Sequence, residues 1–489
     1  MSGNLELQPE AQDDATPRTL GPGSLVSLGL GGVVGAGVFV SIGIAAHDKA
    51  GPAIIVSFLI AAIACIAVAL CYCECASRIP IAGSTYAYGR AALGEIGGWL
   101  SGWNLVTCYF LAGAAVAQGW SGYFQSFLGA LGYGWPARFG GAPIDLDQVH
   151  GGIVASGAML NLPAVLILTI VSIIAYRGIK MSMGVNNLLL GLKLTTLLVV
   201  VAVGLAHFRL ANWLPFAPYG WGGIGPGDKS GDTNAHGSAG VLAGAAMVFF
   251  AFGGFEMLSA YSHECKRPQT DVPRGVIATI GAITSIYIAV AIALTGMIPS
   301  SKISISAPIS DAFRTINMDW AQLLVAFGAV VGMSSVLLVL VMSLPRVLFG
   351  ISQGGLLPGW FGRTHTRFNT PYRSIQCVGV IACIASALLP LRILMDFVMT
   401  CTLAGYISVC VFVLILRRRQ STVQPEFHIM GGPIVPVAGV LICLMMIVAV
   451  PLMNLAALGL WLLIGRTVYA AIRRVKGQLH QPSQAANRA

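Results

Sequence analysis

The sequence predicts an all-α integral membrane protein with about twelve transmembrane helices. Of its 489 residues, 56% are hydrophobic and only 9% are charged, whereas soluble domains carry roughly 25% charged residues. Apolar stretches of about 20 residues, long enough to cross a hydrocarbon core of roughly 30 Å, recur along the chain. The basic residues gather in alternate connections between these stretches. Together these observations exclude a soluble domain.

The expected spans follow one another with short connections. They are residues 24–45, 52–77, 95–131, 160–177, 184–206, 238–262, 276–298, 320–349, 374–390, 394–416, 433–450 and 453–472. An even number of spans places both termini on one side of the membrane. We interpret residues 1–20 as a disordered N-terminus, 21–475 as the membrane domain and 476–489 as a tail, because both ends are polar.

The basic residues predict the orientation, since Lys and Arg are retained on the cytoplasmic face during insertion. Twenty of the 28 lie on the side of the termini, seven lie on the other side, and Lys193 lies inside a span. We therefore expect a multi-pass protein of the inner (plasma) membrane with both termini in the cytoplasm. The formal net charge of +10 belongs to loops next to lipid, so it does not indicate a nucleic-acid partner.

The first span contains five glycines between Gly29 and Gly37. Each glycine costs a helix about 1 kcal/mol relative to alanine. Such a stretch is either a face for close helix packing or a functional break. The sixth span has a second pair, Gly253 and Gly254, next to the acid Glu256. Breaks at corresponding places in two five-helix halves, about 24–206 and 238–416, indicate inverted repeats with a substrate site at the bilayer midplane.

A zwitterion suits two such breaks. Unwound backbone exposes N–H groups at the start of a half-helix, where the dipole is positive and a carboxylate can bind. Carbonyl groups exposed at the other break can accept hydrogen bonds from an ammonium group. Irregular backbone at membrane depth is tolerated only where it is buried or lines a cavity.

Few ionisable residues lie inside the spans. Lys193 is in mid-span, where a charge costs roughly 2.5 to 3.5 kcal/mol, and this position favours a coupling role over a structural anchor. Glu256 either faces the site or hydrogen-bonds backbone freed at the break, and we favour the second. Glu74, Glu95 and Asp396 lie near span ends, so we expect them at the interface.

Several segments resemble the cationic amino acid transporter family of the amino acid, polyamine and organocation (APC) superfamily, including its bacterial members. The resemblance runs from about Leu25 to Leu479. The segments that carry it are Gly35-Ala-Gly-Val-Phe39, Ala76-Ser-Arg-Ile-Pro-Ile-Ala-Gly-Ser-Thr-Tyr86, Gly102-Trp-Asn104, Glu264-Cys-Lys-Arg-Pro-Gln269, Val272-Pro-Arg-Gly275, Gly332-Met-Ser-Ser-Val-Leu337, Gly354-Gly-Leu-Leu-Pro358 and Leu460-Trp-Leu-Leu-Ile-Gly465.

The resemblance implies a five-plus-five inverted-repeat (LeuT-like) transporter fold with two extra C-terminal helices, at 433–472, that works by alternating access. It places the substrate carboxylate at the first break and the ammonium at carbonyls of the second, with pocket side chains from helices six and eight. The matching residues are Gly35, Ala36, Gly37, Phe250, Ala251, Phe252, Gly253 and Met333. Lys193 matches a lysine that stands where related carriers bind sodium, which implies proton coupling or exchange.

The chain departs from the family pattern at Cys108, where a glutamate near the helix-five lysine is usual. A thiol does not replace a carboxylate as a proton acceptor near neutral pH. Cys401 likewise replaces a glycine, and Glu256 replaces an aspartate. Glu256 and Cys108 are therefore our candidates for a pocket or proton partner.

The expected function is secondary active amino acid transport, as proton-coupled uptake of cationic or broadly neutral amino acids. An exchanger of amino acids and a sensor that binds without transport are the alternatives. We expect amino acid, protons and membrane lipid as partners. No catalytic motif, metal spacing or cofactor signature is present in the sequence, so we expect no enzyme, metal or cofactor.

Overall fold

The computed structural model describes most of the chain. The described residues are 21–35, 37–79, 85–146, 153–178, 183–222, 240–256, 258, 265–353, 355–368, 370–419, 427–429, 431–450 and 452–486. Ala36, at the first break, and the end of the sixth predicted span lie outside this set.

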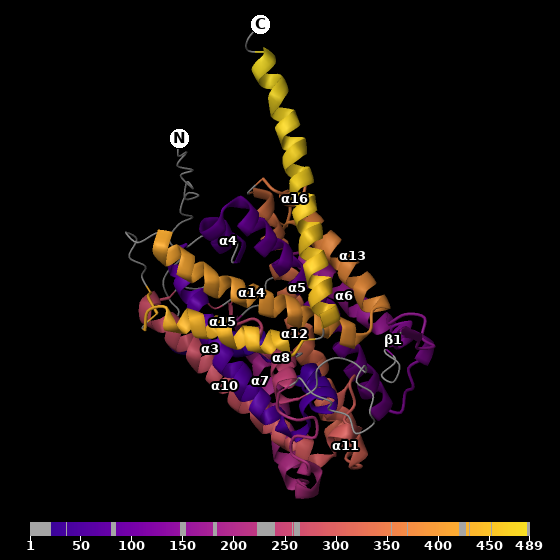
Figure 1. Cartoon of the computed structure of the whole chain (residues 1–489). Coiled ribbons are helices and arrows are strands. Elements are labelled where there is room, and N and C mark those ends of the chain that lie inside the picture. The colour runs from indigo at the N-terminus through magenta and orange to yellow at the C-terminus, as the bar shows by residue number, and fades with distance from the viewer. Residues whose placement is uncertain are drawn as a thin grey trace.

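The described part of the chain is helical apart from one small hairpin (Figure 1). The longer helices are α1 (Pro22–Val33), α3 (Ile54–Arg78), α5 (Glu95–Ala130), α6 (Leu162–Tyr176), α7 (Met183–Ala206), α8 (Val241–Phe249), α10 (Pro268–Met297), α12 (Asp319–Gln353), α13 (Tyr372–Leu388), α14 (Leu391–Arg419), α15 (Ile434–Val448) and α16 (Leu452–Ala486). Each of the twelve predicted spans contains helix. Seven helical stretches among the described residues are long and apolar enough to cross a membrane, and five shorter apolar helices accompany them.

Several elements are not in the sequence prediction. Two short helices, α4 (Thr85–Leu93) and α11 (Pro308–Thr315), lie in predicted connections, and strands β1 (Ile144–Leu146) and β2 (Ile153–Ala155) pair antiparallel in another. Helix α16 continues to Ala486 and projects from the body of the protein (Figure 1). Residue 476, where the predicted tail begins, lies within the bounds of this helix.

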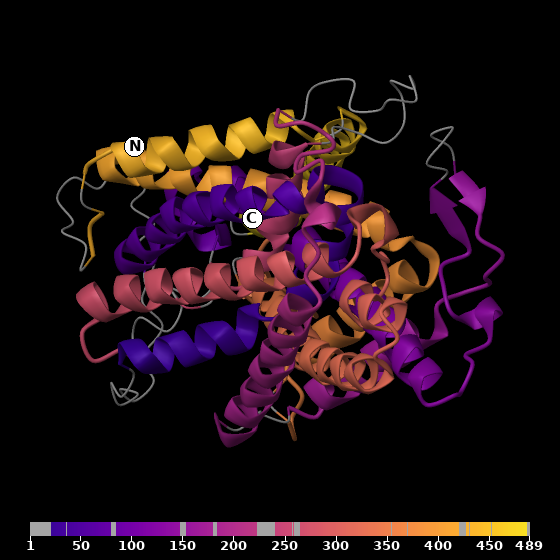
Figure 2. The same ribbon diagram turned by 90° about the horizontal axis from the view of Figure 1, so that it is seen from below.

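The helices pack in two groups joined by α14. Helices α1, α3, α8 and α10 pack on one another, and Figure 2 shows α1 beside α10. Helices α5, α6, α12 and α13 make the second group, and α7 contacts α10 of the first and α12 of the second. Helix α14 packs along α5, yet it also contacts α3 and α15. Its position between the groups matters for the site.

Candidate functional site

The first interrupted helix breaks between Val33 and Gly37. Val34 is extended, with φ −69° and ψ 108°, and the chain resumes as a π-helical turn over Gly37–Ser41. The Gly35 carbonyl oxygen accepts from the N–H groups of Val38 and Phe39 at 3.2 and 3.1 Å. The glycine-rich stretch is thus a true break rather than a continuous packing face.

The second interrupted helix breaks directly after α8. A 3₁₀ turn covers Phe250–Phe252, and the chain leaves the helix at Gly253, whose ψ is 141°. Gly254 has a φ of +108°, which only glycine adopts without strain. Both breaks inferred from the glycine pattern are therefore present.

The two breaks touch each other at Gly37. A Cβ atom at Gly37 would lie 2.4 Å from the Cα atom of Ala251. A Cβ atom at Gly35 would lie 2.4 Å from a methyl carbon of Val336 on α12. Glycine is needed at both places because backbone packs directly on neighbouring backbone or side chain.

Tyr287 of α10 links the same two breaks. Its hydroxyl oxygen lies 3.2 Å from the Val33 carbonyl oxygen and 3.1 Å from the Ala251 carbonyl oxygen. A hydroxyl has one proton to donate, so the two carbonyls share it. Nothing in the sequence distinguishes Tyr287 from other aromatic residues of apolar spans, and it is not among the predicted site residues.

A cavity opens beside the breaks. The walls are formed by both breaks together with α3, α4, α5, α12 and α14. The lining residues are Gly32, Val33, Gly37, Tyr72, Thr85, Leu105, Cys108, Tyr109, Ala112, Val116, Phe250, Gly253, Gly254, Glu256, Val336, Val339, Leu340, Cys401, Thr402, Gly405 and Tyr406. Among these described residues, Glu256 is the one acid. The cavity thus brings together Gly37, Phe250, Gly253, Glu256 and Cys108 from the predicted set.

Glu256 has both positions that the sequence left open. It lines the cavity, and its Oε2 atom accepts from the Gly254 N–H at 2.9 Å, at the break itself. Tyr109 of α5 donates to Oε1 at 3.0 Å, and Tyr406 of α14 donates to Oε2 at 3.3 Å. The carboxylate therefore ties the second break to α5 of the second group and to α14. The two tyrosines are functional candidates that the sequence prediction missed.

Other predicted residues are buried behind the cavity. Phe252 packs its ring on Phe58 and Tyr287, with centroids 6.3 and 5.8 Å apart, and Met333 is fully buried. Ala251 contributes the carbonyl that Tyr287 contacts. None of these three, nor Gly35, lines the cavity in this structure.

Comparison with known proteins shows the family of the chain. The family model described as amino acid permease matches residues 20–464. The chain belongs to the amino acid permease family. Its relatives include the Methylthioribose transporter of Bacillus subtilis (strain 168), 35% identical over 97% of both chains. The Branched-chain amino acid permease BcaP of the same organism is 35% identical over 95% of both chains. Cationic amino acid transporter 4 of Mus musculus is 32% identical over 87% of this chain and 64% of that protein.

The family places the chain in the APC superfamily. It is a multi-pass membrane protein and an amino acid transporter, not an enzyme. In many secondary transporters, interrupted helices of this kind form the substrate site.

In this permease, the Lys193 side chain of α7 reaches the C-terminal end of α1, the first half of the interrupted helix. Its Nζ atom donates to the Gly31 carbonyl oxygen at 3.0 Å, and the side chain is only 1% exposed. The last carbonyls of a helix lack intrahelical partners and carry the negative end of the dipole, so an ammonium group is stabilised there. The Lys193 stem packs against Gly332 of α12, where an added Cβ would lie 3.3 Å from Cγ. Lys193 thus joins α7, α1 and α12 without lining the cavity.

Cys108 faces the cavity from α5. Its sulfur lies 3.1 Å from the Thr402 hydroxyl oxygen on α14. The neighbouring Asn104 donates to the Cys401 carbonyl oxygen at 2.8 Å. The residue in place of the expected acid therefore joins α5 to α14 by a weak polar contact.

Proposed function

We propose that this permease takes up neutral amino acids with protons, by alternating access, through the cavity beside its two helix breaks. The observation that carries the proposal is a cavity with backbone from both breaks and a single acid, Glu256, in an otherwise uncharged wall. We also propose that both termini are cytoplasmic, as the distribution of basic residues predicts.

Recognition of the zwitterion is supported by the ends of the half-helices. Gly37 lines the cavity at the start of the second half of the first helix, where N–H groups favour a carboxylate. Phe250 and Gly253 line it at the second break, and Gly32 and Val33 line it at the end of α1; carbonyl groups at these places favour an ammonium group. The backbone thus provides a binding position for each charged group of the substrate without a buried ion pair.

An apolar substrate side chain is supported by the cavity wall. Its apolar side chains come from α5 and α12 and include Leu105, Val116, Val336 and Leu340. Glu256 would balance either a cationic side chain or a transported proton. Its contacts with Gly254, Tyr109 and Tyr406 already occupy much of its hydrogen-bonding capacity and leave little for a cationic side chain, which favours a neutral substrate. Two relatives named as branched-chain amino acid permeases are consistent with this choice.

Two residues are placed to couple protons to this cycle. Glu256 touches the second break and the cavity, so its protonation would change the contacts that hold the two helix groups. Lys193 touches the first half-helix through the Gly31 carbonyl, so loss of its proton would weaken that contact, because a neutral amine is a weaker donor than an ammonium group. We assign the coupling role to Lys193 and the role of its partner to Glu256.

The substrate class is tested by thermal shift of the purified protein. A ligand that binds the folded state raises its apparent melting temperature. We expect stabilisation by leucine, isoleucine, valine or methionine, and none by lysine or arginine. Stabilisation by the basic amino acids alone would instead assign Glu256 to a cationic side chain.

Coupling is tested in proteoliposomes. Under an inward proton gradient the wild type should concentrate leucine, whereas Lys193→Ala and Glu256→Gln should retain leucine counterflow and lose accumulation. Accumulation by both variants at the wild-type level would contradict the coupling roles. Uptake by the wild type only when the vesicles are preloaded with amino acid would assign exchange.

A further inference from the structure

Helix α14 has an arginine near each end, and each arginine pairs with an acid on the segment that runs from the first break through α3. Arg392 and Arg417 are separated by 25 positions, which corresponds to roughly 37 Å along an α-helix and exceeds the thickness of the hydrocarbon core. Between them, Cys401, Thr402, Gly405 and Tyr406 line the cavity.

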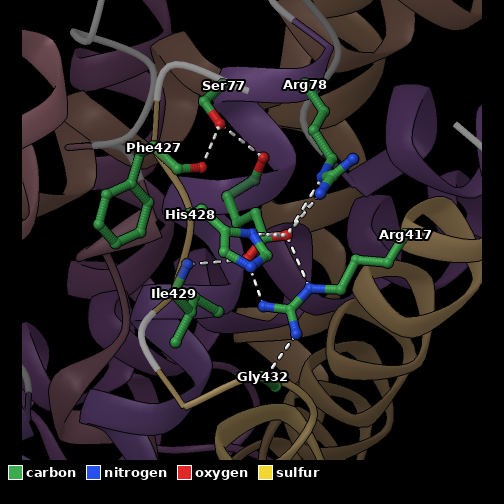
Figure 3. A network of polar contacts seen from close by, with 8 residues as sticks. Ser77, Arg78, Arg417, Phe427, His428, Ile429 and Gly432 are labelled. Carbon is green, nitrogen blue, oxygen red and sulfur yellow. Dashed lines mark hydrogen bonds and ion pairs between the residues drawn. The ribbon is translucent and has the colours of Figure 1, made fainter. Parts of the chain in front are cut away.

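At the end near Arg417, a buried network surrounds Glu74 of α3 (Figure 3). Arg417 makes a bidentate contact, with Nε 2.8 Å from Oε1 and Nη2 2.6 Å from Oε2. Arg78 donates from Nε and Nη2 to Oε1 at 3.1 and 3.0 Å, and the Ile429 N–H donates to Oε2 at 3.1 Å. The Glu74 side chain is 0% exposed. Glu74 lies near the end of α3, and residues far along the chain enclose its side chain.

The same network holds the connection between α14 and α15. Ser77 donates to the Phe427 carbonyl oxygen at 3.0 Å, and His428 lies with Nδ1 3.3 Å from Glu74 Oε1 (Figure 3). Arg417 also donates to the Gly432 carbonyl oxygen. The ends of α3 and α14 and the beginning of α15 are therefore fastened at one point.

At the opposite end, Arg392 pairs with Asp48 at 2.8 Å, just after the first interrupted helix. Both side chains are mostly buried, with exposures of 14% and 15%. His47 contacts the other Asp48 oxygen, and Asp396 lies near Lys49 and hydrogen-bonds to Asn454. Asp396 is therefore part of this second ionic contact, not an isolated interfacial acid.

Each contact would have to break if α14 separated from α3 or from the first helix at that end. Separation would break a mostly buried ion pair, which is unfavourable until water enters. At the cavity, one contact joins α3 to α14 among the described lining residues. The rings of Tyr72 and Tyr406 pack together there, with centroids 5.8 Å apart. Ring contacts slide more easily than buried ion pairs break.

We infer that Glu74–Arg417 and Asp48–Arg392 are two ionic latches on α14 that close the cavity toward opposite sides of the membrane and open in turn during transport. The inference rests on the alternating access proposed above, but not on the substrate or on the coupling ion. Glu74, Arg417, Asp48 and Arg392 are positioning residues, because none of them lines the cavity.

The test measures access to Cys108, a native thiol that lines the cavity. Membranes are prepared right-side-out and inside-out and treated with a membrane-impermeant, charged methanethiosulfonate. The modified fraction of the Cys108 peptide is then measured by mass spectrometry. Only protein that elutes as a single species in size exclusion is counted, so misfolded molecules do not contribute.

We expect Glu74→Gln and Arg417→Gln to raise labelling of Cys108 at least fivefold from the side that carries Arg417–Arg419, and to leave it unchanged from the other side. Asp48→Asn and Arg392→Gln should produce the reverse asymmetry. Arg418→Gln and Arg314→Gln are the matched controls, since both arginines are exposed at the same two ends, and they should label as the wild type does.

An equal rise in labelling from both sides, or no rise from either side in folded protein, would show that the pairs only stabilise the structure. If an amide variant does not fold, Arg417→Lys and Arg392→Lys replace it, because lysine keeps the charge but lacks the planar guanidinium group. We expect these to label two- to threefold above wild type with the same asymmetry, and an absence of asymmetry would overturn the inference. Because labelling needs no substrate, failure of the proposed substrate class would leave this result interpretable.

Discussion

Replacement of Gly37 by alanine tests whether the contact between the two breaks shapes the substrate site. The added Cβ would lie 2.4 Å from Cα, 2.6 Å from Cβ and 2.8 Å from the carbonyl oxygen of Ala251. Ordinary carbon–carbon contacts are about 3.5 to 4.0 Å, so the breaks would have to separate by about 1.1 to 1.6 Å. The obstacle is backbone, which cannot rotate away as a flexible side chain could.

Overpacking of this kind costs typically about 1 to 3 kcal/mol. Because Gly37 and the second break both line the cavity, we expect most of this cost as weaker substrate binding. That free energy corresponds to an affinity loss of about 5- to 150-fold. The assay is the leucine concentration that half-saturates the thermal stabilisation of the purified permease.

Gly113→Ala is the matched control for this measurement. Gly113 is buried in α5, and no atom outside its own stretch of helix lies within 4 Å of the place that a Cβ would take. Alanine there removes a helix glycine, so stability should be unchanged or rise by about 0.5 to 1 kcal/mol. A Gly37→Ala protein whose leucine affinity stays within twofold of the wild type would refute the contact-based reasoning.

The remaining predictions concern the acid, the last helix and the substrate. Tyr406→Phe removes a hydroxyl that donates to Glu256, so we expect proton-driven leucine uptake to fall by about tenfold, as measured in proteoliposomes, with counterflow less affected. In Gly465→Leu the added Cβ atom would lie 2.7 Å from the ring of Trp103, so we expect a lower melting temperature. Gly459 has open space around it, so Gly459→Leu should leave the melting temperature unchanged. Both should keep the wild-type half-saturating leucine concentration. The amide and the decarboxylated amine of leucine should compete poorly for uptake, and strong inhibition by either would contradict recognition of the zwitterion.

The spans and the breaks could be predicted because they depend on local sequence. Apolar length determines which segments cross the membrane, and paired glycines mark where a helix cannot continue. The connections were less predictable: α4 and the β1–β2 hairpin lie between the apolar spans, in segments without a strong periodic pattern. Helix α4 packs against α5 and α14, and these contacts are not visible in the sequence.

The side chains around the cavity could be predicted only in part. Residues of the breaks themselves, such as Gly37 and Gly253, line it as expected. Phe252 does not, because a break resets the direction in which the following side chains point, and helical periodicity no longer applies. Tyr109 and Tyr406 were not predictable, because an aromatic residue in an apolar span gives the same sequence pattern whether its ring only packs or its hydroxyl also donates a hydrogen bond. Glu74 meets Arg417 across 343 positions of sequence, a separation that no local pattern encodes.

The contact between the breaks also determines how substrate binding and helix movement are connected. Gly37 packs on Ala251, and Tyr287 shares its proton between carbonyls on the two sides of that contact. A movement of one break is therefore transmitted directly to the other, and no side chain of the substrate pocket lies between them. Lys193 holds α1 just before the first break, and Glu256 holds the chain just after the second. A proton gained or lost at either residue would thus act on one connected unit, and this unit faces α14 through Tyr406, midway between the two ionic latches.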